Sequence, residues 1–538
     1  MEATIETGCN WLQQCLKEHD CCKKKATLAM IFSTDNMHIV RDLGHDDRMP
    51  RRLLWIDPGT GSEHLNLVEI GKTTEEIPYI ALSHSWGCGE TFKTTMANID
   101  KPKGGIRLSD LPRSFRDAVE VTRGLGYEYL WIDSLCIIQD NPKDWKDEAP
   151  RMAVVYGNAI CSIMAMDSID SYGGLLGDPN SKPGILLSRA WVLQERMISS
   201  RTLVFTNNRV YWECRECDAS QDKPNFVRRP PQNDAEMKQT HPKELFALMR
   251  DFRVEGLTVN PDEHEFINIY EGLYTEKETY DPFLKAWWEF VELYTPCKLS
   301  FESDKFLAVN GVAAITQRFT RLRNCWGLWR DFMDQDLLWS IDPKGPLSRR
   351  PKRWRAPFWS WASTEDGRVV NTYYKRLPVQ PRLMLKPEIF VGVNTSFDQS
   401  LPIPAWSREA YKMELRGDLR SAELITKLDD AGNLVYEISL ESTSRFSDEE
   451  VHEFRPDAPL KVGSLAVQCL LFLHYDKDAL GEDHYIDVRL VLLWIGDEGD
   501  DNHDRVFKRI GYLETTYKEM RDQDGINEDF WWKYVQLR

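Results

Sequence analysis

The stretch SDLPRSFRDAVEVTRGLGYEYLWID, residues 109–133, decides the fold class of this chain. A serine and an aspartate at its start can cap a helix, and Pro112 lies in the first turn, where a missing N–H costs nothing. Apolar residues then recur at steps of three and four until Gly126, a typical C-terminal stop. Residues 129–132, YLWI, read as a strand buried on both faces. This pairing of a helix with a wholly apolar strand predicts an α/β fold with a parallel sheet flanked by helices.

The same alternation extends on both sides of this stretch. Residues 79–86, YIALSHSW, are followed by a glycine and read as a short buried strand that opens into a loop. Further predicted elements are a strand at 51–57, a helix at 144–156, a strand at 159–166, a helix at 189–197, and strands at 202–205 and 210–212.

Four regions follow from these patterns. They are an N-terminal helical segment (1–50), the α/β domain (51–217), a mainly helical region (218–355) and a β-rich C-terminal region (356–538). The third region opens with a polar linker at 218–240 and contains helices at 281–294 and 304–319, which we expect to pack beside each other. In the fourth, short runs such as 434–440 and 488–495 favour strands.

Composition limits the classes of function. The 538 residues carry a net charge of −17, from 68 Lys and Arg against 85 Asp and Glu, which argues against general binding of nucleic acid or anionic membrane. No stretch of 18 apolar residues could span a bilayer, and the N-terminus lacks the apolar core of a secretory signal. Twelve cysteines in so long a chain are too sparse for a disulfide scaffold, so we expect a reducing, cytoplasmic setting.

Polar residues follow the predicted parallel strands at their carboxyl ends, where ligands gather in open α/β sheets. The first strand ends in Ser83, His84, Ser85 and Trp86, and the second in Asp133, Ser134 and Cys136, with Gln139, Asp140, Trp145 and Glu148 beyond. Trp145 and Glu148 are three residues apart and share a helix face. An aromatic wall beside a carboxylate suits a flat cationic ring. The alternative is a Trp145 that belongs to the core and a Glu148 that is merely solvated.

Three motifs carry a resemblance to a known family: YIALSHSWG at 79–87, the run from Leu111 to Trp145, and RAWVLQERMISSRTLVF at 189–205 followed by WEC at 212–214. In order and spacing they resemble the fungal heterokaryon incompatibility (HET) domain over about residues 51–214. The upstream WLQQCLKEHDCC is similar to a segment that often precedes this domain. The downstream DKFLAVNGVAA, GLWRDFMDQDLLW and FWSWAS resemble the region that commonly follows it.

The resemblance implies a TIR/flavodoxin-like fold and a role in fungal non-self recognition and programmed cell death. HET domains are thought to be distant relatives of TIR domains, some of which cleave NAD at the nicotinamide–ribose bond with a glutamate on a helix after a central strand, often in a W-x-x-E pattern. Trp145-Lys-Asp-Glu148 matches that pattern. It implies Glu148 as the principal catalytic group, with Trp145 and Trp86 shaping the pocket. NAD enters as a substrate, and no cofactor is expected.

Pro150 departs from the family, whose helix usually continues at this point. Proline is disfavoured inside a helix and welcome at its first position. The sequence therefore leaves open whether the helix starts near Ala149, with Glu148 in the preceding turn.

The block Arg189, Trp191, Gln194 and Glu195 is the second set of candidate binding residues. Arg189 could reach a carboxylate or phosphate. The alternative is a buried ion pair between Arg189 and an acidic residue, joining this helix to the sheet. Cys136 could be a nucleophile if a base lowered its pKa, or a buried structural thiol.

Other chemistries find less support. Ser83, His84 and Asp133 have the residue types of a hydrolase triad, but adjacent strand residues point to opposite faces. Cys15, His19 and Cys22, with Cys9 or Cys21, and the pair Cys214-x-x-Cys217 could each offer zinc ligands. Neither of these two groups lies at the usual zinc-finger spacing from a second pair of ligands, so the sequence predicts no metal site. No glycine-rich phosphate loop appears, which disfavours kinases, NTPases and Rossmann dehydrogenases.

Three functions remain open from the sequence. The first is hydrolysis of NAD or a related nucleotide by a HET protein. The second is a non-catalytic signalling module that acts by self-association. The third is a biosynthetic isomerase or cyclase on a HET-like scaffold, with His84, Asp133 and Glu148 exchanging protons with a small-molecule ligand.

Overall fold

The computed structural model describes most of the chain, with gaps. The described residues are 1–23, 30–32, 39–42, 49–57, 63–71, 76–87, 92–177, 186–229, 241–251, 281–320, 322, 324–329, 332–346, 348–353, 355–371, 388–393, 411–440, 451–476, 485–497, 505–517 and 532–537. They divide into two compact units. One comprises residues 1–254 and 297–320, and the other comprises 255–296 and 321–538.

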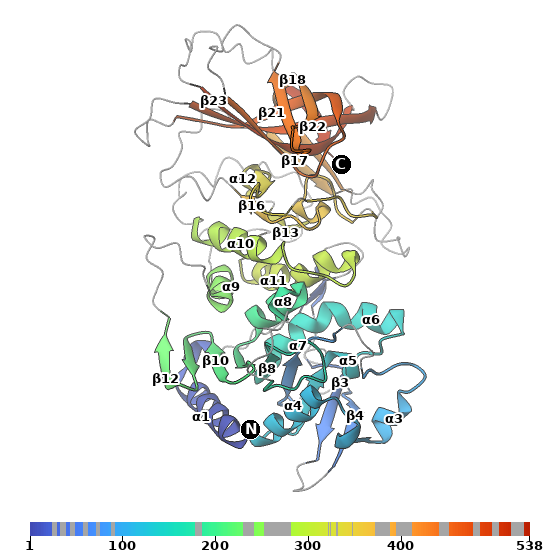
Figure 1. The fold of residues 1–538 in the computed structure, drawn as a ribbon, viewed down its shortest axis with the longest axis vertical. Helices are drawn as coiled ribbons and strands as arrows, with labels where there is room; N and C mark the ends of the chain where they lie inside the picture. Colours follow the sequence, from blue (N-terminus) through green and yellow to red (C-terminus); the bar gives the residue numbers. More distant parts are fainter. Residues whose placement is uncertain are drawn as a thin grey trace. The chain divides into compact units, whose positions relative to one another are not determined.

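A ten-stranded mixed sheet forms the centre of the first unit (Figure 1). In spatial order its strands are β12 (Lys223–Arg228), β11 (Cys217–Ser220), β10 (Val210–Cys214), β9 (Arg201–Phe205), β8 (Cys161–Ala165), β5 (Ile80–Ser83), β7 (Tyr129–Ile132), β3 (Arg52–Ile56), β4 (His64–Glu69) and β6 (Ile106–Arg107). The four central strands β9, β8, β5 and β7 are mutually parallel. All of their side chains are buried except the half-buried Tyr129 at the start of β7.

The prediction of a parallel sheet is confirmed for these four strands and is wrong for the flanks. β3, β4 and β6 pair antiparallel on one side, and β10, β11 and β12 do so on the other. Short connections such as the one from Phe205 to Val210 allow only a hairpin, because a parallel crossover needs a dozen residues or more. Part of the predicted linker forms β11 and β12, and residues 230–240 lie outside the described part of the chain.

The helix predicted ahead of Gly126 is present as α4 (Arg113–Gly124). Pro112 is its N-cap, and the predicted apolar face is buried against the sheet. Gly126 has a φ of 84°, which only glycine adopts at little cost, so the chain can turn directly into β7.

The helical stretch predicted at 144–156 is broken in two. Helix α6 (Pro142–Glu148) starts with Pro142 in its first position, and the Asn141 side chain accepts hydrogen bonds from the next two free N–H groups. A 3₁₀ turn (Ala149–Arg151) contains Pro150, and α7 (Met152–Asn158) follows. Glu148 is therefore the last residue of a helix that begins well before Ala149.

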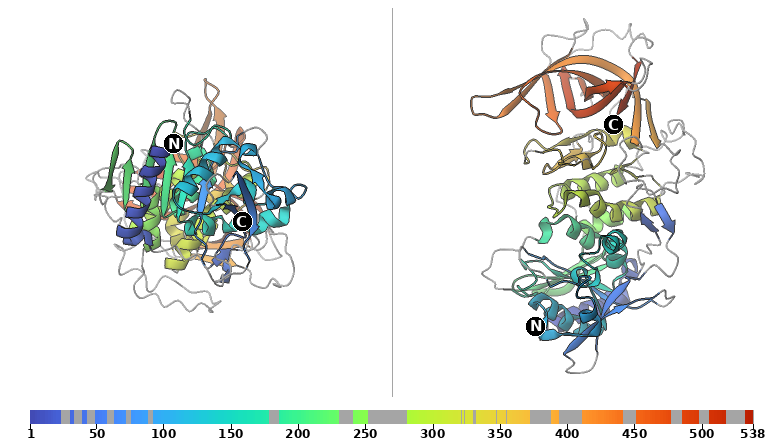
Figure 2. Two further views of the ribbon diagram at one scale, coloured as in Figure 1. Left: turned by 90° about the horizontal axis from the view of Figure 1, so that it is seen from below. Right: turned by 90° about the vertical axis from the view of Figure 1, so that its right-hand side faces the viewer.

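The remaining helices of the first unit surround the sheet. They include α1 (Glu2–Glu18), α2 (Asp20–Lys23), α3 (Asp100–Gly104), α5 (Asp133–Cys136), α8 (Ala190–Ile198), α9 (Pro242–Asp251) and α11 (Lys305–Thr320). Helix α1 lies along β10 to β12 in both Figure 1 and Figure 2, and the Trp11 indole donates to the Pro224 carbonyl of β12 at 2.7 Å. A short hairpin of β1 (Met30–Phe32) and β2 (Ile39–Asp42) completes the N-terminal region.

The second unit holds α10 (Asp281–Tyr294), the small strand pairs β13–β14 (Asn324–Cys325, Leu328–Trp329) and β15–β16 (Trp339–Ile341, Val369–Asn371), and α12 (Met333–Asp336). An eight-stranded sheet follows, made of β17 (Glu388–Val393), β18 (Tyr411–Leu428), β19 (Leu434–Leu440), β20 (Val451–Pro456), β21 (Gly463–Asp476), β22 (Tyr485–Asp497), β23 (Arg505–Tyr517) and β24 (Trp532–Leu537). The predicted β-rich C-terminal region is confirmed. The predicted helix at 304–319 corresponds to α11, which belongs to the first unit.

Buried charge is a feature of the second unit's core. The Arg509 guanidinium lies 3.7 Å above the Trp339 ring and bonds Asp457 at 3.1 Å, and both charged side chains are almost fully buried. Arg350 contacts the same carboxylate at 3.3 Å. Among the described helices of the whole chain, none has both the length and the apolar character that a bilayer crossing requires.

Candidate functional site

The carboxyl edge of the central parallel strands is where the structure gathers buried polar side chains. The chain leaves β5 for β7 on one side and then crosses to β8 on the other. A reversal of this kind opens a crevice at the carboxyl ends of the strands, where ligands bind in open α/β sheets. Ser83 and His84 at the end of β5 and Asp133 after β7 lie at this edge, as the sequence predicts.

His84 is buried and its ring makes an edge contact with Phe115 of α4, at 4.9 Å between ring centres. Its Nδ1 lies 3.6 Å from Asp133 Oδ1. Burial lowers the pKa of His84, although Asp133 acts in the opposite direction, so the imidazole is neutral at neutral pH. The other Asp133 oxygen accepts from the Trp86 indole at 2.8 Å, which fixes the carboxylate beside the imidazole.

Glu195 occupies the other face of the same edge. It lies on α8 and is 6% exposed. Burial raises its pKa to about 7, with Asp133 adding to the effect and the hydroxyls of Ser83 and Tyr156 opposing it. At neutral pH this carboxyl is therefore divided between its protonated and ionised forms, as suits a group that gives and takes protons.

Several buried polar atoms at this edge have no hydrogen-bond partner among the described residues. They are both ring nitrogens of His84 and Oε2 of Glu195. Buried polar groups in proteins are nearly always hydrogen-bonded, so such a group of free donors and acceptors calls for a ligand or water. Asp133, Trp86 and Arg189 are only partly buried and connect the group to solvent.

The Ser83, His84 and Asp133 side chains do not form a hydrolase triad. Ser83 lies near Glu195 and Tyr156, whereas His84 faces Phe115 and Asp133. The different neighbours agree with the expectation that successive strand residues diverge.

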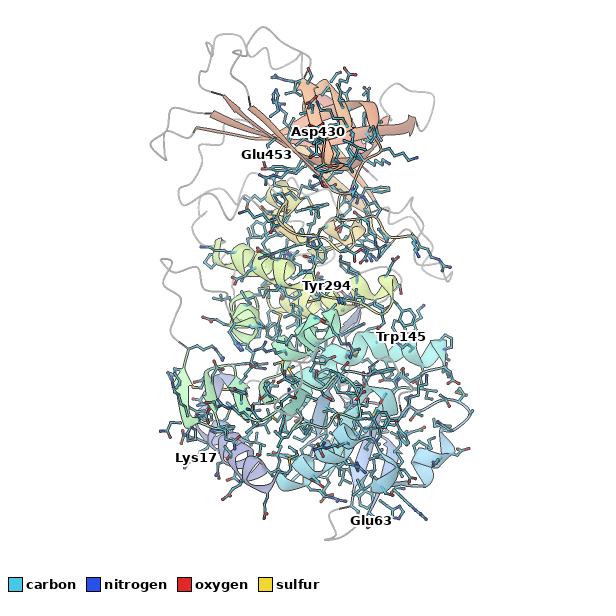
Figure 3. All side chains as sticks on the ribbon, in the orientation of Figure 1. Lys17, Glu63, Trp145, Tyr294, Asp430 and Glu453 are labelled. Atoms are coloured by element: carbon cyan, nitrogen blue, oxygen red, sulfur yellow. The ribbon has the colours of Figure 1, made fainter. Side chains whose placement is uncertain are left out.

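Glu148 lies in a different environment, lined by arginines. It is 2% exposed, so it is not a merely solvated side chain. Its Oε1 is 3.2 Å from Arg51 Nε, and Arg52 forms a bidentate ion pair with the neighbouring Asp144. Burial raises the pKa of Glu148, while Arg151 and the other two arginines oppose that rise. Trp145, labelled on α6 in Figure 3, is half-buried against the main core of the unit.

The predicted residues of the α8 block have two kinds of surroundings: some lie near the polar side chains at the end of β5, and others pack against a neighbouring helix. Arg189 donates to the His84 carbonyl at 2.7 Å, which orients it toward the end of β5. Gln194 instead faces α11, where a Cβ added to Gly311 would lie 2.5 Å from its side-chain nitrogen. Trp191 interacts with Asp304, whose pKa is raised by burial and partly lowered by that contact.

Cys136 and Gln139, two predicted site residues that follow β7, contribute to packing and to the structure of the loop. Cys136 is 1% exposed and burial raises its pKa to about 12, so it is a neutral thiol at physiological pH. The Gln139 amide donates to the carbonyls of Asp133 and Ile137, both at 3.0 Å, and so braces the loop that carries Asp133.

Tyr156 also lies among the polar side chains around Glu195, and the sequence did not predict this. Its hydroxyl donates to the Leu82 carbonyl at 3.0 Å beside Glu195. Tyr156 falls in an apolar helical stretch, where its periodicity marks a core residue and nothing more.

A second polar group could hold a metal ion. Cys15, His19, Cys22 and Cys214 are all buried, and their donor atoms lie within 4.8 Å of one another. This group lies at the end of β10, the third strand from one side of the sheet, next to α1 and α2.

Comparison with known proteins identifies one region. The family model described as heterokaryon incompatibility protein (HET) matches residues 79–184. The match covers β5, β7 and β8 with His84, Asp133 and Glu148, and it ends before α8. The recognition of a HET domain in the sequence is confirmed over this range. The search of curated proteins and the search of solved structures returned no match.

Proposed function

We propose that this chain, with its HET region at residues 79–184, is a heterokaryon-incompatibility-type protein that cleaves NAD or a related nucleotide at its glycosidic bond, with Glu195 as the reacting carboxyl. The observation that carries the proposal is the environment of Glu195. This buried carboxyl has a pKa of about 7 and a free Oε2, beside the end of β5. The neutral imidazole of His84 lies at the same strand end.

Cleavage of such a bond breaks the link between the ribose C1′ and the nicotinamide nitrogen. The bonding electrons leave with the nitrogen, so neutral nicotinamide departs and the ribose carries an oxocarbenium-like positive charge. An ionised Glu195 stabilises that charge. Water then attacks C1′ and loses its proton to the Glu195 carboxylate, whose pKa of about 7 allows it to accept that proton.

Arg189 and Trp86, which are only partly buried near the end of β5, are suited to bind the remaining parts of the nucleotide. Arg189, anchored on the His84 carbonyl, has donors suited to a phosphate. The Trp86 indole ring, held by Asp133, offers an aromatic face to a base.

Glu148 fits this chemistry less well, although its W-x-x-E setting pointed to it. Burial raises the pKa of Glu148 overall although three arginines oppose that rise, and a carboxylate paired with Arg51 has less negative charge to offer a ribosyl cation. We therefore assign Glu148 to the arginine-lined contact between α6 and β3, and it serves as a matched control for Glu195.

The test is nicotinamide release from NAD by the purified full chain, followed by chromatography, for the wild type, Glu195→Gln and Glu148→Gln. We expect Glu195→Gln to lower the rate about 100-fold or more, the scale of an acid–base or electrostatic group, and Glu148→Gln to retain most of the rate. Far- and near-UV circular dichroism checks that each variant is folded. Loss of activity in Glu148→Gln alone would return the role to that residue, and no release by the wild type would refute NAD cleavage.

A second function is favoured by the same observation. The neutral imidazole of His84 and the Glu195 carboxyl, with a pKa of about 7, are each able to exchange protons with a small molecule, as an isomerase or cyclase requires. Native mass spectrometry of the purified chain separates the two proposals, because a retained non-nucleotide ligand that is lost in Glu195→Gln supports this one.

A further inference from the structure

Two chain segments that are far apart in sequence meet at the end of β10 in the first unit. One is the end of α1 together with α2, which supplies Cys15, His19 and Cys22. The other is the hairpin of β10 and β11, which supplies Cys214 at the end of β10. All four side chains are buried, and every sulfur and imidazole donor lies within 4.8 Å of the others.

The spacing of these donors fits a single tetrahedral ion. With Zn–S bonds of about 2.3 Å and Zn–N bonds of about 2.0 Å, tetrahedral geometry places a sulfur about 3.5 Å from a nitrogen ligand and about 3.8 Å from another sulfur. Cys214 Sγ lies 3.4 Å from His19 Nδ1, which matches the first value.

We propose that Cys15, His19, Cys22 and Cys214 bind one Zn²⁺ ion in a closed, structural Cys₃His site. Three soft sulfurs and one imidazole in a tetrahedral arrangement favour zinc over harder divalent ions. The site has four protein ligands, so no position is left for water or a substrate.

The groups around these four residues are those that a zinc–thiolate centre needs. The backbone N–H of Cys217 donates to Cys214 Sγ at 3.3 Å, and its own sulfur lies 3.7 Å from His19 Nε2. Such contacts orient the ligands and fix the imidazole tautomer. Zinc with three thiolates carries one net negative charge, and the buried Arg201 guanidinium offsets it by donating to Cys15 Sγ at 3.3 Å.

A disulfide would not account for the whole cluster. All of its cysteines are free thiols in this structure. A bond between any two of the three sulfurs would leave the third thiol and the buried imidazole without a role. A second set, Cys21, Cys22 and Glu216, shares Cys22 and is only partly buried, so it does not provide a separate closed site.

The ion would fasten the N-terminal helix to β10 of the sheet. The Trp11 bond to Pro224 and the packing of the His19 ring on Phe226, 4.8 Å between ring centres, lie along the same α1–strand contact. In the sequence, Cys15, His19 and Cys22 form one half-site and Cys214 with Cys217 forms another. Only the fold shows that the two halves combine.

The first test is the metal content of the full chain, purified under reducing conditions and given Zn²⁺ before removal of free metal. We expect about one zinc per chain by mass spectrometry of the elements. Cys214→Ser should lose it, while Cys297→Ser, which changes a half-buried thiol outside the cluster, should keep it. Less than about one fifth of an equivalent in the wild type, or equal retention in Cys214→Ser, would overturn the proposal.

Two measurements on the wild type cover the case in which Cys214→Ser does not fold. Replacement of zinc by Co²⁺ should give the visible bands of a tetrahedral ion together with intense thiolate-to-cobalt charge transfer. Alkylation with and without a chelator, mapped by mass spectrometry, should show Cys15, Cys22 and Cys214 labelled faster once the metal is removed, whereas the buried Cys136 outside the cluster should keep the same rate. Octahedral cobalt spectra, or a disulfide within the cluster, would contradict a zinc site. None of these readouts depends on NAD cleavage.

Discussion

Replacing Glu195 with glutamine should change how the stability of the first unit depends on pH. The structure raises the pKa of this carboxyl from 4.5 to about 7. Each pKa unit corresponds to about 1.4 kcal/mol, so the fold disfavours the ionised form by about 3 kcal/mol. The Glu195→Gln variant has no such ionisation and keeps a side chain of nearly the same shape.

The sign of this pH dependence follows from the number of protons that the folded and the unfolded chain bind at each pH. Below pH 4.5 Glu195 is protonated in both the folded and the unfolded chain and contributes no pH dependence. Between pH 4.5 and 7 only the folded chain retains the proton, so the free energy of unfolding falls as pH rises. Above pH 7 the loss levels off. Relative to Glu195→Gln, the wild type should therefore lose about 3 kcal/mol between pH 4 and pH 8.

Urea unfolding read by hydrogen exchange in peptides from β5 and α8 isolates the first unit from the second. The control is Glu69→Gln in β4. The ion pair with Lys103, at 2.7 Å, lowers the pKa of Glu69, so its pH dependence lies below pH 4.5. Its difference from the wild type should stay constant from pH 5 to 8. A Glu195→Gln difference that is also constant over this range would show that Glu195 is ionised throughout, and the proposed acid–base role would fail.

Three further predictions concern packing and reactivity. Asp457→Ala leaves Arg509 as a buried charge without its carboxylate, so unfolding of the second unit should become easier by about 3–5 kcal/mol in urea titrations read at β23. Gly311→Ala places a methyl group 2.6 Å from the Ala153 Cβ and should cost about 1–3 kcal/mol, with partial recovery in the Gly311→Ala, Ala153→Gly double variant. Cys136 should resist iodoacetamide at pH 8 in the native chain, because burial raises its pKa to about 12, and rapid labelling in mapped peptides would contradict that burial.

Local signals in the sequence were sufficient for the parallel centre of the sheet. The apolar periodicity of α4, the stop at Gly126 and the four apolar residues of β7 each act within a few positions of one another. The antiparallel flanks carry weaker signals. β12 is an edge strand whose side chains are mostly exposed, so its polar sequence resembles a loop.

The chemistry of the sites depends on contacts between distant segments. Arg51 and Arg52 stand almost a hundred positions before Glu148, and nothing in the W-x-x-E pattern indicates that they surround it. Glu195 has a pKa near neutrality because the fold buries it beside Ser83, which lies more than a hundred positions upstream. The sequence spacing predicted which residue types lie at the carboxyl edge of the strands. The different environments of Glu148 and Glu195 are visible only in the packed structure.

The first unit is interrupted in sequence, since residues 255–296 belong to the second unit and 297–320 return to the first. Helix α11 is the returning piece, and its Gly311 permits close approach to α7 and to the helix that bears Glu195. A fragment cut after residue 254 would retain every parallel strand of the ten-stranded sheet and yet expose to water the side of α8 that packs on α11. During ribosomal synthesis α11 is made after every other part of the first unit and after residues 255–296 of the second. The unit that carries the proposed catalytic site therefore cannot complete its fold until part of the second unit has been made.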